Sequence, residues 1–83
     1  MSIEQNMTPR FSQTIEAALT LFLTQHQPHL PKNLHALAMT AIEKPLLKLI
    51  MQKTENNQSE AAKILGLNRA TLRKKLVEHH LFN

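Results

Sequence analysis

Apolar side chains recur at helical spacing in the first third of the chain. After Pro9 they lie three or four residues apart and include Phe11, Ile15, Ala18, Leu19 and Phe22. This spacing predicts an amphipathic helix. Its start is open between Pro9, which suits a first helical turn, and Ser12, which suits a cap. The next segment, QHQPHLPKN, holds Pro28 and Pro31 and predicts a loop.

A second, longer helix is predicted from Lys32–Asn33 to about Lys53. One face carries apolar residues at helical spacing, namely Leu34, Leu37, Ala38, Ala41, Ile42, Leu46, Leu49 and Ile50. Much of the opposite side is apolar too, through Ala36, Met39, Leu47 and Met51. A helix that is apolar nearly all round must be covered all round, and the rest of this chain is too short to do so. We therefore expect an obligate homodimer.

Pro45 lies inside this pattern, where it removes one backbone hydrogen bond and crowds the preceding turn. Because the apolar spacing keeps its phase across Pro45, we expect a kink within one continuous helix. The alternative is two separate helices that meet at Glu43–Lys44.

The run NQSEAAKILGLNRATLRKKL, residues 57–76, carries start and stop signals for two short helices. Asn57 can cap the first helix, with Glu60 three residues later as in a capping box. Gly66, the one glycine of the chain, lies where a helix would end in a left-handed residue. Asn68 can cap the second helix. This order of elements predicts a helix-turn-helix.

The second short helix is expected to turn Leu72 and Leu76 inward. The side chains left largely outward are of the types that grip or read DNA, namely Arg69, Thr71, Arg73, Lys74 and Lys75. Arginine can bind guanine through two hydrogen bonds, and lysine can neutralise a phosphate. The alternative is an ordinary helical hairpin with a solvated basic face.

Composition narrows the classes of function. The 83-residue chain has a net charge of +4, and residues 44–83 hold eight Lys and Arg against three Glu. A basic half of this kind is expected to bind a polyanion. There is no cysteine, and no apolar run is long enough to span a membrane. No arrangement of side chains suggests a catalytic dyad or triad, so we expect no enzyme, cofactor or small-molecule substrate.

The histidines are not expected to bind metal. His26, His29 and His35 lie within ten residues, but two of them fall in the proline-broken loop and no Cys or Asp accompanies them. His79 and His80 are expected at most to add positive charge below about pH 6.5.

The helix-turn-helix run and the segment before it resemble the factor-for-inversion-stimulation (Fis) family of bacterial nucleoid-associated proteins. The strongest likeness is EKPLLKLIMQKTENNQSEAAKILGLNRATLRKKL, residues 43–76, and a weaker one reaches back to Pro9. The resemblance implies an all-α homodimer with four helices per subunit and a C-terminal helix-turn-helix. It also implies a sequence-tolerant DNA-binding and DNA-bending transcriptional regulator in the cytoplasm, associated with the nucleoid.

Matched position by position, the resemblance implies eight DNA-binding residues. Five match contacts of the recognition helix: Asn68, Arg69, Thr71, Arg73 and Lys74. Of these, Arg69 is the candidate for reading a guanine in each half-site. Three match phosphate contacts: Asn57, Ser59 and Lys75. In the family both recognition helices reach the DNA only when it bends, so sequence is read partly through deformability.

The expected organisation has three parts: a short mobile tail over residues 1–8, a two-helix dimerisation region over 9–55, and a helix-turn-helix region over 56–83. Only eight residues precede Pro9 and none is glycine, so we do not expect the N-terminal hairpin with which family members stimulate a recombinase. Val77 and Glu78 replace lysines of those members, which predicts a smaller DNA bend.

Two other functions stay open. One is a dimeric helical module that binds protein, and the other is the DNA-binding part of a larger Fis-type transcriptional activator. Salt dependence separates the first from a DNA binder, since about 6–10 phosphate contacts cost roughly 10³–10⁵ in affinity between about 50 and 200 mM salt. RNA polymerase and other transcription proteins are further candidate partners.

Overall fold

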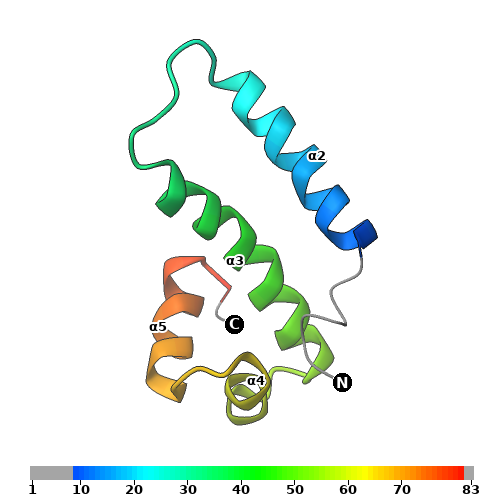
Figure 1. Ribbon diagram of the computed structural model, residues 1–83. Helices are drawn as coiled ribbons and strands as arrows, with labels where there is room; N and C mark the ends of the chain where they lie inside the picture. The colour runs from blue at the N-terminus through cyan, green and yellow to red at the C-terminus, as the bar shows by residue number, and fades with distance from the viewer. Residues whose placement is uncertain (1–8, 82–83) are drawn as a thin grey trace. The chain divides into compact units, whose positions relative to one another are not determined.

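The computed structural model describes residues 9–81, which form four helices and, within that range, no strand (Figure 1). The helices are α2 (Pro9–Gln25), α3 (Leu34–Lys53), α4 (Gln58–Leu65) and α5 (Arg69–Glu78). The all-α prediction is confirmed, and the expected tail over residues 1–8 lies outside the described residues. The chain divides into two compact units, one through Leu34 that contains α2, and one from His35 that contains α4 and α5.

The first helix, α2, begins at Pro9 rather than at Ser12. Proline has no backbone N–H, so it loses no hydrogen bond in a first turn, and its fixed φ suits the helix. The helix ends at Gln25, and residues 26–33 form the predicted loop, with a cis peptide bond between Gln27 and Pro28.

The long helix α3 is continuous across Pro45, which excludes two separate helices that meet at Glu43–Lys44. It begins at Leu34, slightly later than predicted, because residues 32–33 form a turn. The predicted boundary between dimerisation and helix-turn-helix regions, at residues 55–56, falls inside the second compact unit. That boundary divides roles and stays a prediction. None of the helices within residues 9–81 is long and apolar enough to cross a membrane.

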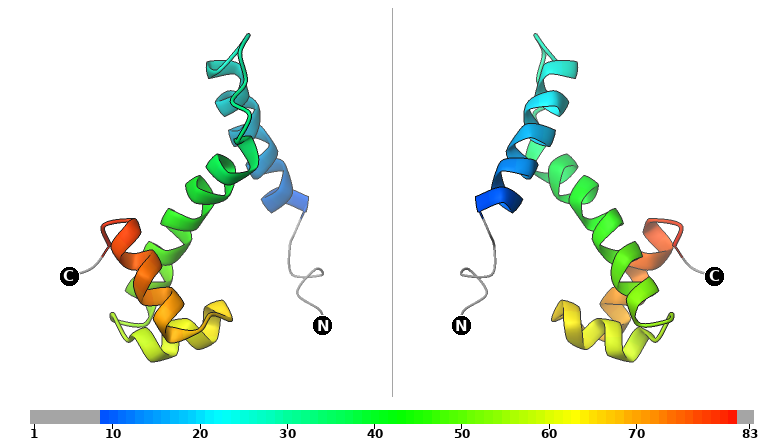
Figure 2. Two further views of the ribbon diagram at one scale, coloured as in Figure 1. Left: turned by 90° about the vertical axis from the view of Figure 1, so that its left-hand side faces the viewer. Right: turned by 90° about the vertical axis from the view of Figure 1, so that its right-hand side faces the viewer.

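The core of the second unit is a small cluster shared by three helices. It buries six apolar side chains: Leu47 and Met51 from α3, Ala61 and Ala62 from α4, and Leu72 and Leu76 from α5. The short alanine side chains let α4 approach its neighbours closely. Figure 2 shows α4 and α5 folded against the carboxyl half of α3. This cluster holds the two short helices of the helix-turn-helix to the long one.

The core predicts which substitutions unfold the protein. Leu72 is fully buried, so Leu72→Ala should lower the free energy of unfolding by about 2–5 kcal/mol, through lost burial and the cavity left behind. Val77→Ala on the same helix is the matched control, because Val77 is 57% exposed and should change that free energy by about 0.5 kcal/mol at most. Urea unfolding followed by circular dichroism measures both, and equal effects would contradict this core.

Candidate nucleic-acid interface

The turn between α4 and α5 has the geometry that the sequence predicts. Gly66 ends α4 with a φ of +71°, in the left-handed region that residues with a Cβ adopt only at a cost. Its backbone N–H donates to the carbonyl of Lys63 at 3.2 Å, and that of Leu67 donates to the carbonyl of Ala62 at 2.9 Å. These bonds satisfy carbonyl groups that a helix end leaves without partners.

Both predicted asparagine caps are present. The side-chain oxygen of Asn57 accepts from the backbone N–H of Glu60 at 3.1 Å, and that of Asn68 accepts from Ala70 at 2.8 Å. One half of the expected capping box forms, because the N–H of Asn57 is donated to the carbonyl of Thr54 (3.0 Å) rather than to Glu60. Each cap uses only the amide oxygen, and the amide NH₂ group offers two donors that a phosphate oxygen can accept.

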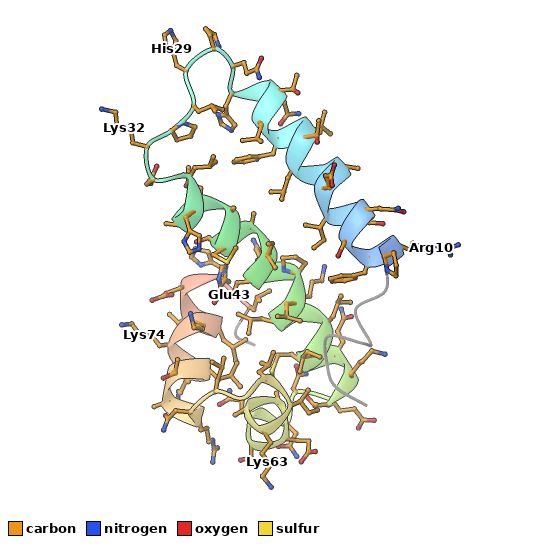
Figure 3. All side chains as sticks on the ribbon, viewed as in Figure 1. Arg10, His29, Lys32, Glu43, Lys63 and Lys74 are labelled. Carbon is orange, nitrogen blue, oxygen red and sulfur yellow. The ribbon has the colours of Figure 1, made fainter. Side chains whose placement is uncertain are left out.

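Seven of the eight predicted contact residues are exposed: Asn57, Ser59, Asn68, Arg69, Thr71, Arg73 and Lys74. They come from the start of α4, the turn and α5. Figure 3 shows Lys74 on α5 and Lys63 on α4 pointing away from α3. Lys63 is a cation that the sequence analysis did not single out. The second unit therefore presents hydrogen-bond donors and positive charge from two successive helices, which can bind phosphates and reach base edges.

Lys75 differs from the other seven residues. Its Nζ lies 2.8 Å from Oε2 of Glu43, and its side chain is 29% exposed. The other carboxylate oxygen of Glu43, Oε1, lies 2.8 Å from Nε2 of His79, which is buried. The expectation that Lys75 points largely outward is therefore corrected. The interpretation of His79 as a surface charge is corrected as well, since its ring closes off one end of the core.

The sequence analysis missed Glu43 as a neighbour of the candidate interface. Lys75 and His79 are four residues apart, so they lie on one side of α5, next to the buried Leu72 and Leu76. That spacing was a local signal that both side chains border the core. Their partner is on α3, 32 positions before Lys75, and only the tertiary structure brings it there.

This cluster, Glu43–Lys75–His79, shifts two pKa values. Hydrogen bonds from Lys75 and then from His79 lower the pKa of Glu43 below its ordinary value of 4.5. The hydrogen bond to Glu43 raises the pKa of Lys75 above its ordinary value of 10.5. Near neutral pH the two side chains therefore form a charged pair.

The other histidines do not form a metal site in the described part of the chain. Within residues 9–81, no three His, Asp or Glu side chains gather as metal ligands would. His26 contacts the ring of Phe22, with ring centroids 4.7 Å apart. His29 projects from the loop in Figure 3.

A glycine-terminated α4, an asparagine-capped α5 and exposed cations along α5 define a helix-turn-helix protein with a basic recognition helix. The profile of the family described as "Bacterial regulatory protein, Fis family" matches residues 38–79. The chain belongs to this family, and the resemblance noted in the sequence is confirmed.

Curated relatives match over most of the chain. The "DNA-binding protein Fis" of Mannheimia haemolytica is 40% identical over 75 residues, which cover 90% of this chain and 76% of the relative. That of Buchnera aphidicola subsp. Acyrthosiphon pisum (strain 5A) is 37% identical over 78 residues, 94% of this chain and 80% of the relative. That of Aliivibrio fischeri (strain MJ11) is 41% identical over 66 residues, 80% of this chain and 67% of the relative. The likeness thus extends beyond the residues that the family profile matches.

The Glu43 cluster predicts a pH dependence of stability. The pKa of Glu43 is lowered on folding, so its contribution is complete above the ordinary value of 4.5 and is lost as pH falls through the lower folded value. The free energy of unfolding of wild type should therefore exceed that of Glu43→Gln at about pH 6, and the difference should shrink towards about pH 3. Chemical unfolding of both proteins across this range measures it. A difference that does not change with pH would contradict the ion pair.

Proposed function

We propose that this protein is a homodimeric, sequence-tolerant DNA-binding and DNA-bending regulator of transcription that acts at the bacterial nucleoid in the cytoplasm. The observation that carries the proposal is the row of exposed side chains on α5, Arg69, Thr71, Arg73 and Lys74. The printed names of its relatives, DNA-binding proteins, support the same function. The protein is a regulator and not an enzyme. The alternative, a module that binds only protein, gives these cations no role.

The two short helices divide the work of binding DNA between them. Arg69 is the first residue of α5, directly after the Asn68 cap, where its guanidinium can bind O6 and N7 of a guanine in the major groove. Arg73 and Lys74 follow one turn later and are proposed to bind phosphates or neighbouring bases. Asn57 and Ser59, at the start of α4, place donors where the free N–H groups of that helix also favour a phosphate.

A row of exposed apolar residues on α3 supports the homodimer. Met39, Ile42, Leu46 and Leu49 follow one another at intervals of three, four and three residues and are 37–53% exposed. This spacing is the seam pattern of two helices that pack along their length. The row, called the α3 stripe, lies on a different side of the helix from the buried Leu47 and Met51. A second copy of the chain would cover it.

The apolar residues of α2 support the same conclusion. This helix buries none of its side chains, and its Leu21 is 62% exposed and its Phe11 51%. Large exposed apolar side chains gathered on one element mark an interaction surface. In the proposed homodimer, α2 contributes to the interface together with the α3 stripe.

The proposal includes protein partners as well. RNA polymerase and other transcription proteins are proposed partners, and the exposed Ile64 on α4 (56%) offers an apolar contact outside the recognition helix. Val77 and Glu78 on α5 are exposed and carry no positive charge, which supports a smaller bend of flanking DNA.

The DNA-binding proposal predicts a specific defect in Arg69→Ala. Wild type should bind an A/T-centred duplex flanked by G and C more tightly than a scrambled duplex, and its affinity should fall steeply between about 50 and 200 mM salt. Arg69→Ala should weaken binding to the flanked duplex by about 1–3 kcal/mol and remove the preference. Fluorescence anisotropy measures all four combinations.

Arg10→Ala is the matched control for Arg69→Ala, because it removes the same charge from the start of α2, outside the helix-turn-helix. Its preference for the flanked duplex should stay as in wild type. A folded wild-type dimer that binds neither duplex at low salt would overturn the DNA-binding proposal and favour the protein-interaction module.

The homodimer predicts the effect of a charge in the α3 stripe. Sedimentation equilibrium of wild type should give about twice the 9.5 kDa of one chain. Leu49→Glu should abolish the dimer, because a carboxylate in an apolar interface loses its hydration without gaining a partner. Val77→Glu, at an equally exposed position off the stripe, should stay dimeric. A monomeric wild type, or a Leu49→Glu variant that sediments as the dimer, would contradict the assignment of this interface.

A further inference from the structure

A single carboxylate links α3 to the last turns of α5. Glu43 accepts a hydrogen bond from Lys75 through one oxygen and lies within hydrogen-bond distance of the ring nitrogen of His79 through the other, each at 2.8 Å. Figure 3 shows Glu43 on the side of α3 where α5 lies, whereas Lys74 points the other way. With a ring nitrogen and an ammonium group on its two oxygens, the carboxylate holds α5 at two points, four residues apart.

The helical position of Lys75 explains why it is captured and Lys74 is not. At 3.6 residues per turn, Lys75 lies roughly 70° from the centre of the buried face of α5, which carries Leu72, Leu76 and His79. Lys74 lies roughly 170° from that centre, on the opposite side. Two neighbouring lysines in the run RKKL therefore have different surroundings: one faces solvent and the other faces α3.

Release of Lys75 to a phosphate would leave a charge behind. Glu43 is 31% exposed, and without Lys75 its carboxylate would keep only His79 as a partner at the margin of the core. A carboxylate that loses its cation beside a bound polyanion also repels that polyanion. A new contact between Lys75 and a phosphate would therefore replace one charge pair with another and add little.

We propose that Glu43 is a positioning residue for the recognition helix and that it keeps Lys75 out of the set of phosphate contacts. The inference rests on the proposed DNA-binding function. It revises the role that the family resemblance implied for Lys75, because this side chain orients α5 instead of binding phosphate. Lys74, one residue earlier, supplies the phosphate contact from this part of the helix.

The salt dependence of DNA binding tests the inference. Each phosphate neutralised by a cation adds about 0.9 to the slope of log K against log salt, and hence about 1.8 for a homodimer. We expect Lys75→Met to leave the slope of wild type unchanged. The matched control, Lys74→Met, should reduce the slope by about 1.8. Methionine keeps an apolar stem of similar length, so the two variants differ only in which ammonium group is removed.

Removal of the carboxylate should release Lys75. In Glu43→Gln the slope should rise by up to about 1.8, as Lys75 becomes able to bind a phosphate. The double variant Glu43→Gln with Lys75→Met separates this effect from the mere loss of a negative charge. If released Lys75 is responsible, the slope of the double variant returns to that of wild type. If lost repulsion is responsible, the increase persists in the double variant and the proposal is wrong.

Thermal unfolding without DNA tests the positioning role separately. The effects of Glu43→Gln and Lys75→Met on stability should be non-additive, because each removes the same ion pair, whereas Glu43→Gln and Lys74→Met should add. Additive effects of the first two variants would overturn the positioning role.

The outcomes also separate the two proposals. A normal wild-type slope that falls in Lys75→Met as much as in Lys74→Met overturns this inference and leaves the DNA-binding function intact. A wild type with no salt-dependent binding overturns the DNA-binding function, and the withholding of Lys75 with it.

Discussion

The helix-turn-helix depends on the burial of two leucines of α5 against α3. Helices of eight and ten residues, the lengths of α4 and α5, are marginal in water on their own. Leu72 and Leu76 reach nearly complete burial through the cluster they share with Leu47 and Met51. Every exposed cation of α5 is held in place by this cluster, so the interface is only as rigid as the core behind it.

The long helix α3 serves three purposes through the spacing of its residues. Leu47 and Met51 face α4 and α5, and Glu43, one turn before Leu47, extends the same side with a carboxylate. The α3 stripe occupies a different side of the helix and remains exposed. A helix is stiff over its length, so the surface proposed to hold a second copy is mechanically joined to the surface that orients α5. This arrangement fits a protein whose two recognition helices must keep a set separation.

A basic sequence does not reveal which of its cations reach a polyanion. The run RKKL places Arg73, Lys74 and Lys75 in succession, and composition treats them alike. In the folded chain Lys75 is bound to a carboxylate of α3, whereas Lys74 is exposed. The net charge of a recognition helix therefore overstates the charge available to its partner wherever one flank of the helix borders the core.

The sequence by itself determined the features that local chemistry controls. Pro9 in a first turn, the left-handed Gly66 and the caps at Asn57 and Asn68 act on their own backbone or on residues at most a few positions away, so their residue types predicted the helices, the turn and the family. Only the tertiary structure decided which side of α3 forms the core, how deeply His79 is buried, and what Lys75 binds. The reason is distance along the chain: Glu43 meets its partners across 32 and 36 positions, and no local pattern encodes a contact that folding alone brings together.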